Sequence, residues 1–169
     1  MVLETLSGGA LVPISLSAMS YLIRVLTTLG PEARRQAAER LDKAFDGMVL
    51  SGASTLWETA LGAKDFQDAG SLCHAWSSID VYFAHAEVLG IKPLEPGFAR
   101  FSVGPYPGHL FEASGSVVTP AGPITVEWVR KDGGLSIRIT APEQLRPELR
   151  PYPEVPILEV TYNGTRLTL

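Results

Sequence analysis

The sequence predicts an α+β fold in which about three N-terminal α-helices are followed by a small antiparallel β-sandwich. Proline placement is the first observation behind this prediction. Only Pro13 and Pro31 precede residue 90, and each stands where a helix would begin. The second observation is a change of pattern near residue 91, from helical spacing of apolar residues to short alternating stretches separated by turn residues. We therefore expect a helical part at residues 1–91 and a β-sandwich domain at residues 92–169.

Three segments have apolar residues at helical spacing: residues 13–29, 31–48 and 71–89. The apolar residues at this spacing in the first segment are Ile14, Ala18, Tyr21, Leu22, Val25, Leu26 and Leu29. Gly30 separates the first two helices, and Gly90 is placed to cap the third.

The second half of the chain contains about six stretches that alternate between apolar and polar residues: residues 98–103, 110–118, 124–130, 135–140, 157–162 and 165–169. Asp132-Gly133 and Asn163-Gly164 lie between such stretches, where these dipeptides are strong hairpin signals. The alternation predicts strands with one buried face and one solvated face.

Composition excludes several classes of protein. A chain of 169 residues with net charge -4 and no long run of Lys and Arg is not expected to bind nucleic acid. Pro13 and Arg24 interrupt the apolar run at residues 11–29, which favours a buried helix over a membrane span. The N-terminus has no basic region followed by an apolar run, so a cytoplasmic location is expected.

Metal ions and cofactors are not expected. Cys73 is the single cysteine, and no two of the three histidines have metal-ligand spacing. The neighbours of Cys73 favour a packed, inert thiol. Asn163-Gly164-Thr165 matches a glycosylation acceptor, but a β-turn explains it better in a chain without a secretory signal.

The strongest functional candidate is a pair of short motifs, GASTLWE at residues 52–58 and SLCHAW at residues 71–76. They supply a carboxylate (Glu58), an imidazole (His74) and two indoles (Trp57 and Trp76). Aromatic faces stack on sugar rings, while carboxylates and imidazoles bind hydroxyls or move protons. The combination predicts a carbohydrate site.

Each of these residues also has a structural explanation. Thr55 and Glu58 have the spacing of a capping box, in which both side chains cap one helix N-terminus. His74 could be a hydrogen-bonded residue in the first turn of a helix, and both tryptophans could belong to the core. Asp65 and Asp68 are most simply a loop residue and an N-cap. Local sequence leaves these alternatives open.

The wider order of motifs resembles a known family. GASTLWE is followed by DAGSLCHAW at residues 68–76, GIKP at 90–93, PGFARF at 96–101 and PAGPITVEW at 120–128. This order is similar to the C-terminal end of the bacterial α-L-rhamnosidases of glycoside hydrolase family 78. There the end of an (α/α)6 barrel passes into a C-terminal β-domain. The resemblance extends over essentially the whole chain.

The resemblance implies a role for each motif. Members are inverting hydrolases, and the glutamate that matches Glu58 is the general base acting on the attacking water. The histidine that matches His74 lies in the rhamnose site, and Trp57 and Trp76 are expected beside it. The partner implied is a rhamnoside or a related saccharide. An inverting site needs two carboxyl groups roughly 6.5–9.5 Å apart.

One departure from the family limits the expected function. In the family, the general acid lies far upstream of the residues that this chain resembles. About three helices also cannot close an (α/α)6 barrel. We expect a C-terminal fragment or remnant that lacks the acid and is inactive alone, which leaves its status as an enzyme open. Two alternatives remain: a non-catalytic carbohydrate-binding module, and an interaction protein that oligomerises through exposed helices. Unpaired barrel helices would expose apolar surface, so a homodimer or association with the missing barrel portion is expected.

Overall fold

The computed structural model describes residues 15–168. The chain forms two compact units that divide between Val81 and Tyr82. The boundary expected from sequence, between residues 91 and 92, stays a prediction. The start of the first predicted helix lies outside the described residues. Among the described residues, no helix is long and apolar enough to cross a lipid bilayer.

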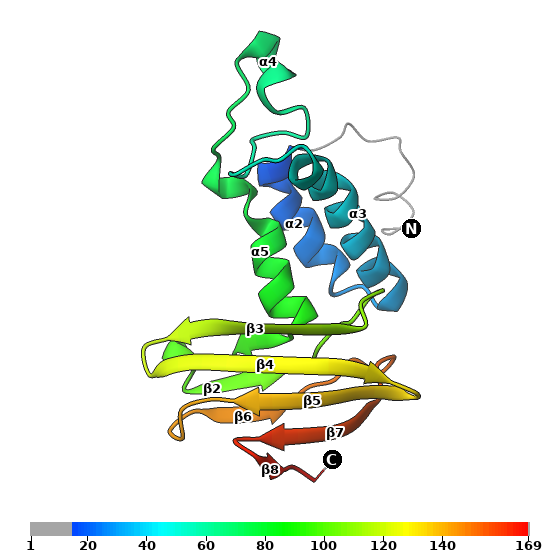
Figure 1. The fold of residues 1–169 in the computed structure, drawn as a ribbon, viewed down its shortest axis with the longest axis vertical. Coiled ribbons are helices and arrows are strands. Elements are labelled where there is room, and N and C mark those ends of the chain that lie inside the picture. The colour runs from blue at the N-terminus through cyan, green and yellow to red at the C-terminus, as the bar shows by residue number, and fades with distance from the viewer. Residues whose placement is uncertain (1–14, 169) are drawn as a thin grey trace. The chain divides into compact units, whose positions relative to one another are not determined.

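The first unit is built on two packed helices, α2 (Leu16–Leu26) and α3 (Pro31–Leu50), which lie side by side (Figure 1). Ser15 caps α2, with its hydroxyl accepting the Ala18 amide at 3.3 Å. Gly30 connects the helices with a φ of 105°, and Pro31 opens α3 at a position that tolerates proline. The buried apolar residues of the pair are Leu16, Ile23, Leu26, Ala33, Ala37, Leu41, Phe45 and Met48.

Burial follows the helical spacing predicted for residues 13–29 only in part: Leu26 is fully buried, but three other residues of that pattern are exposed. Tyr21 is 76% exposed, and Val25 and Leu29 are each 45% exposed. The helix has apolar residues on two faces, and α3 offers one apolar row that covers only the face containing Ile23 and Leu26. Periodicity could not reveal which of the two faces the neighbouring helix would cover.

The rest of the first unit is short and irregular. It contains η1 (Gly62–Lys64), α4 (Asp65–Asp68), η2 (Ala75–Ser77) and the beginning of α5 (Ile79–Phe83). The helix predicted at residues 71–89 is therefore shorter than expected. Residues 71–74 form no helix, and regular helix begins only at Ile79.

The second unit begins with the end of α5 and a π-helical turn, η3 (Ala84–Val88). A three-stranded sheet follows the order β1-β2-β6, from β1 (Ile91–Pro93), β2 (Arg100–Val103) and β6 (Arg146–Leu149). The five-stranded sheet follows the order β3-β4-β5-β7-β8, from β3 (Glu112–Thr119), β4 (Gly122–Lys131), β5 (Gly134–Thr140), β7 (Ile157–Tyr162) and β8 (Thr165–Arg166). A single turn, η4 (Pro96–Phe98), precedes β2.

This architecture confirms the predicted fold class, N-terminal helices followed by a β-sandwich. The β2–β6 and β5–β7 pairs are parallel, and the other pairs are antiparallel. Figure 1 shows β2 and β6 behind the five-stranded sheet. The sequence did not predict β1 and β6, because both are very short and contain a proline.

The sandwich core centres on Trp128, which is 1% exposed. Its indole N–H donates to the Val88 carbonyl at 2.8 Å, so the sheet and the π-helical turn share one hydrogen bond. Phe101 is fully buried as well. The fully or almost fully buried aliphatic residues of the core are Val103, Ile124, Val126, Leu135, Ile137, Ile139 and Val160.

The predicted turn at Asn163-Gly164 is confirmed. Both residues have positive φ, 47° and 81°, as a tight hairpin of this type requires. The Asn163 side-chain amide also bonds the Ala141 backbone twice, accepting its N–H at 3.0 Å and donating to its carbonyl at 2.9 Å. The asparagine therefore serves the fold as a turn residue.

One buried ionic cluster ties the π-helical turn to the sandwich. Glu87 is 4% exposed, and its carboxylate accepts bonds from the Lys92 ammonium at 2.8 Å and from the Tyr152 hydroxyl. Lys92 also donates to the Tyr152 oxygen at 3.0 Å. Burial acts to lower the pKa of Lys92, but the bonds to Glu87 and Tyr152 outweigh it, and that pKa lies above its ordinary value. Burial raises the pKa of Tyr152.

We predict that Glu87→Ala lowers the free energy of unfolding of the second unit by about 2–4 kcal/mol. The substitution leaves the Lys92 charge and the Tyr152 hydroxyl without their shared acceptor. Urea unfolding followed through the indole N–H resonance of Trp128 measures this loss. The matched control is Arg100→Ala, which removes exposed ion pairs with Glu95 and Glu148 and should lower stability much less. Equal losses for the two variants would contradict a special role for the buried cluster.

Candidate functional site

The two motifs singled out in the sequence lie against each other in the first unit. The Glu58 amide donates to the Ser71 carbonyl at 2.9 Å, and the His74 amide donates to the Leu56 carbonyl at 2.8 Å. The Thr55 hydroxyl adds a bond to the Leu72 carbonyl. Backbone pairing thus places the segment that contains Glu58 beside the segment that contains His74.

Glu58 is half-buried at this pairing. Its Oε2 accepts the Ser71 amide at 3.4 Å, and the partly exposed side chain can be reached by water. The capping-box alternative is wrong, because no helix begins near Thr55. The Thr55 hydroxyl bonds residue 72 instead, so pairing with a distant segment replaces the local bonds that a cap would make.

Trp57 is half-buried against its own loop. Its backbone amide contacts the Met48 sulfur at 3.3 Å, which anchors the segment to the end of α3. The indole lies directly on the backbone of Gly62, where a Cβ would stand only 2.6 Å from the ring atom Cε3. Gly62 also has a φ of 57°, so two independent constraints favour glycine there.

His74 is half-buried, and Trp76 is 79% exposed. The His74 Nε2 lies 3.3 Å from the Ser17 hydroxyl of α2, which orients the imidazole. The His74 and Trp76 rings meet edge to face, with centroids 5.9 Å apart and an interplanar angle of 82°. The alternative that Trp76 belongs to the core is therefore wrong, since its indole offers most of its surface to solvent.

Within the described residues, no hydrogen bond joins the Glu58 and His74 side chains. The structure brings together the segments that contain them and orients each side chain through a different neighbour. The catalytic and substrate-binding roles of Glu58, His74, Trp57 and Trp76 stay predictions. Among residues 15–168, no three His, Cys, Asp or Glu side chains are grouped closely enough to hold a metal ion.

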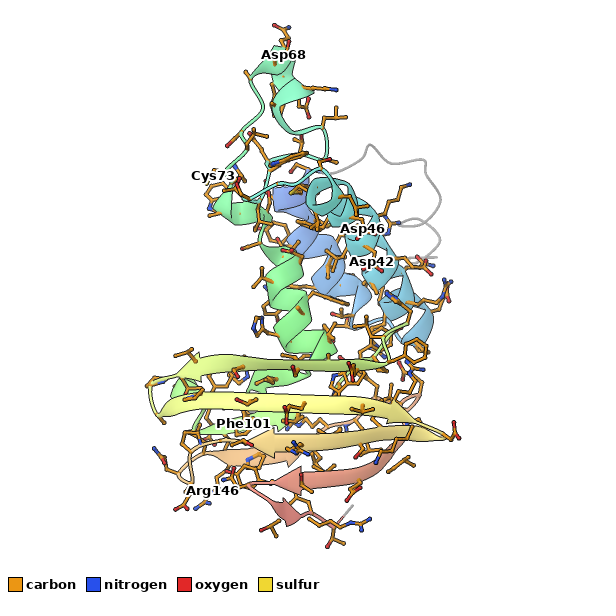
Figure 2. The ribbon with its side chains drawn as sticks, viewed as in Figure 1. Asp42, Asp46, Asp68, Cys73, Phe101 and Arg146 are labelled. Atoms are coloured by element: carbon orange, nitrogen blue, oxygen red, sulfur yellow. The ribbon has the colours of Figure 1, made fainter. Side chains whose placement is uncertain are left out.

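Two predictions about neighbouring residues need correction. Cys73 is exposed and not packed, because residues 71–74 run as an extended surface segment (Figure 2). Asp68 is not an N-cap for a helix at residue 71, since no helix begins there. It lies at the end of α4 with a φ of 65°, while Asp65 is the first residue of α4 and its side chain accepts the Phe66 amide at 2.8 Å.

Sequence reasoning missed the hydrogen-bond partner of His74 and three buried polar atoms of the first unit. Ser17 is 57 positions away in the chain, so no local pattern connects the two. Ser77 Oγ, Asp80 Oδ1 and Thr59 Oγ1 are buried atoms without a hydrogen-bond partner among the described residues. Leaving such a group unpaired costs about 1–3 kcal/mol, so each requires a water or a further polar partner.

Comparisons with known proteins agree with the motifs. Residues 90–150 match the model of the bacterial alpha-L-rhamnosidase C-terminal domain. A curated alpha-L-rhamnosidase from Alteromonas sp. (strain LOR) is 32% identical over 110 residues, which cover 61% of this chain. The crystal structure of the GH78 family rhamnosidase of Bacillus sp. GL1 matches 88% of the chain with 28% identity and a TM-score of 0.76.

A fourth comparison supports the fold alone. The α-L-rhamnosidase from Dictyoglumus thermophilum matches 79% of the chain with 24% identity and a TM-score of 0.68. This chain spans only 12% of the Alteromonas relative and 16% of the Bacillus structure. The resemblance inferred from the motifs is confirmed, and it concerns the C-terminal portion of much longer proteins.

We predict that Gly62→Ala loosens the pairing between the two motifs. A methyl group at this position clashes with the Trp57 ring, and the positive φ is strained for any residue with a Cβ. Together the two effects lower the free energy of unfolding by about 2 kcal/mol or more. Hydrogen exchange at the Glu58 and His74 amides should accelerate at least tenfold. Gly52→Ala is the matched control, because Gly52 has a φ of 76° but no atom within 4 Å of its Cβ position. Equal acceleration in both variants would show that Trp57 packing contributes nothing to the pairing.

Proposed function

Because this chain corresponds to the C-terminal portion of a family 78 α-L-rhamnosidase, we propose that it supplies the base-side half of a rhamnoside-cleaving site. Glu58 is the proposed general base, and His74, Trp57 and Trp76 are the proposed sugar contacts. The observation that supports this proposal most is the backbone pairing between residues 55–58 and residues 71–74. It joins a partly exposed carboxylate to an oriented imidazole and an exposed indole.

In the proposed mechanism, the Glu58 carboxylate takes a proton from a water molecule as that water attacks the anomeric carbon. The glycosidic bond breaks on the opposite face, and an acid outside these 169 residues protonates the leaving oxygen. A separation of roughly 6.5–9.5 Å between the two carboxyl groups leaves room for the water and inverts the anomeric configuration. Half-exposed placement suits Glu58 to this role, because the attacking water must reach it.

His74 and Trp76 would hold the sugar in this scheme. The Ser17 hydroxyl fixes one imidazole nitrogen of His74, which leaves the other to bond a sugar hydroxyl. The exposed indole of Trp76 offers an apolar face to the C–H side of the ring. Their edge-to-face contact holds both side chains in one arrangement.

Two features of the first unit support completion of the site by further helices. Tyr21 and Val25 on α2 and Leu29 in the turn after it form an exposed apolar stripe, a surface that an ordinary helix would bury. Ser77 and Asp80 contain buried polar atoms that lack partners among the described residues. A neighbouring helix with apolar and polar side chains would satisfy both, as the remainder of the barrel would in the longer relatives.

We predict negligible hydrolase activity for the isolated chain and measurable activity for a chimera. In the chimera, this chain replaces the matching 16% of the Bacillus sp. GL1 rhamnosidase. Release of the aryl group from an aryl α-L-rhamnoside gives the rate. Glu58→Gln should lower kcat of the chimera about 100-fold or more, because Gln cannot accept the proton.

The control for this experiment is Glu143→Gln, which alters an exposed glutamate of the second unit and should leave kcat unchanged. A Glu58→Gln chimera with full activity would refute the base assignment. Rhamnoside cleavage by the isolated chain that Glu58→Gln abolishes would refute the need for an outside acid.

A second candidate function, self-association through the helices, is favoured by the same apolar stripe. We predict that the isolated chain forms a homodimer at micromolar concentration in light scattering, because dimerisation covers Tyr21, Val25 and Leu29. Val25→Glu places a charge in the stripe and should give monomers. Val118→Glu is the control, since Val118 is 85% exposed on a strand of the other unit and its substitution should leave the dimer intact. A wild-type monomer would contradict this function.

A further inference from the structure

The outer face of the five-stranded sheet has a groove of its own, far in sequence from Glu58 and His74. Its volume is about 670 Å³, and its lining residues come from β3, β4, β5 and β7 of the second unit. Trp128 contributes to the floor but turns its indole into the core. The groove is therefore lined by side chains that alternate outward along the strands.

Strand register arranges these side chains in a row. Ser114 lies opposite Glu127, Glu127 lies opposite Arg138, and Arg138 lies opposite Thr161. With strands about 4.8 Å apart, three spacings give a polar row about 14 Å long. A second row of side chains, next to the first, runs from Val129 on β4 to Ser136 on β5 and Glu159 on β7. A short chain molecule could lie across four strands and contact each of them.

The centre of the row is an exposed ion pair. Arg138 Nη1 lies 3.1 Å from Glu127 Oε2, and their side chains are 70% and 46% exposed. The pair uses one of five guanidinium donors and leaves a carboxylate oxygen open. An acceptor beside a donor matches two vicinal hydroxyl groups, because each hydroxyl can both donate and accept.

The charge of the groove narrows the class of ligand. Glu112, Glu127 and Glu159 are nearly balanced by Lys131 and Arg138, so the lining attracts neither a polyanion nor a polycation strongly. Val129, which is 45% exposed, adds an apolar surface for C–H groups. A neutral molecule rich in hydroxyl groups is the class that fits both features.

We infer that this groove is a non-catalytic binding site for a neutral oligosaccharide, recognised through vicinal hydroxyls by the Glu127–Arg138 pair. The inference does not rest on the function proposed for Glu58 and His74, since the groove belongs entirely to the second unit. No indole stacks on the ligand there, so we expect weak binding, with Kd of about 1 mM. A low-affinity site of this kind would retain a polymeric substrate near the chain.

The test is a ¹H–¹⁵N NMR titration of the full chain with a neutral trisaccharide of α-L-rhamnose. Saturable shifts at the amides of Ser114, Glu127, Arg138 and Thr161 are expected. Tetraethylene glycol, a chain of similar length without vicinal hydroxyls, should cause no saturable shift. Arg138→Ala should weaken binding at least fivefold while the rest of the spectrum stays folded.

Arg100→Ala is the matched control, because it removes an exposed ion pair of the same kind from the other sheet and should leave binding unchanged. The inference would be overturned by no saturable shift with the trisaccharide, by an equal response to tetraethylene glycol, or by unaltered binding of Arg138→Ala. Shifts confined to amides around Glu58 and His74 would also overturn it, while supporting the site in the first unit. If Arg138→Ala does not fold, the same titration is done with Glu127→Ala, which removes the other member of the ion pair.

Discussion

Backbone pairing between residues 55–58 and residues 71–74 is the interaction on which the candidate site depends. Without it, Glu58 and His74 would lie on separate parts of an irregular loop. The bonds are few, and they bridge segments that contain no regular helix or sheet. Packing of Trp57 on Gly62 and the contact of its amide with Met48 hold the same loop to α3. A functional loop supported by a rigid helix pair is a common arrangement for binding residues.

The second unit is stabilised by different interactions. Its sandwich buries Trp128 and a set of branched aliphatic residues, and the Glu87 cluster adds a satisfied ionic network at the edge of that core. A buried carboxylate is tolerated there because both of its oxygens have donors. The helical unit, in contrast, leaves Tyr21 and its neighbours on α2 in solvent. The two units therefore differ in how completely they bury their apolar side chains.

Most of the fold could be predicted from local chemistry. Proline placement, the glycine between α2 and α3, and the Asn163-Gly164 turn each act within a few residues, and the structure contains all of them. The failures are non-local. Thr55 has a capping spacing but bonds residue 72, and the apolar stripe of Tyr21, Val25 and Leu29 is 45–76% exposed. The Ser17–His74 contact joins residues that no sequence pattern relates, so the setting of the site could not be predicted.

The central claim is that Glu58 activates the attacking water of an inverting site completed by residues outside this chain. Azide rescue tests it most directly, in a Glu58→Ala form of the Bacillus chimera acting on an aryl α-L-rhamnoside. Azide needs no base, so it can replace the water, forming a C–N bond as the aryl C–O bond breaks. We expect NMR of the product to show β-L-rhamnosyl azide, the inverted anomer. An azide of α configuration, or no rescue in a folded chimera, would contradict the claim.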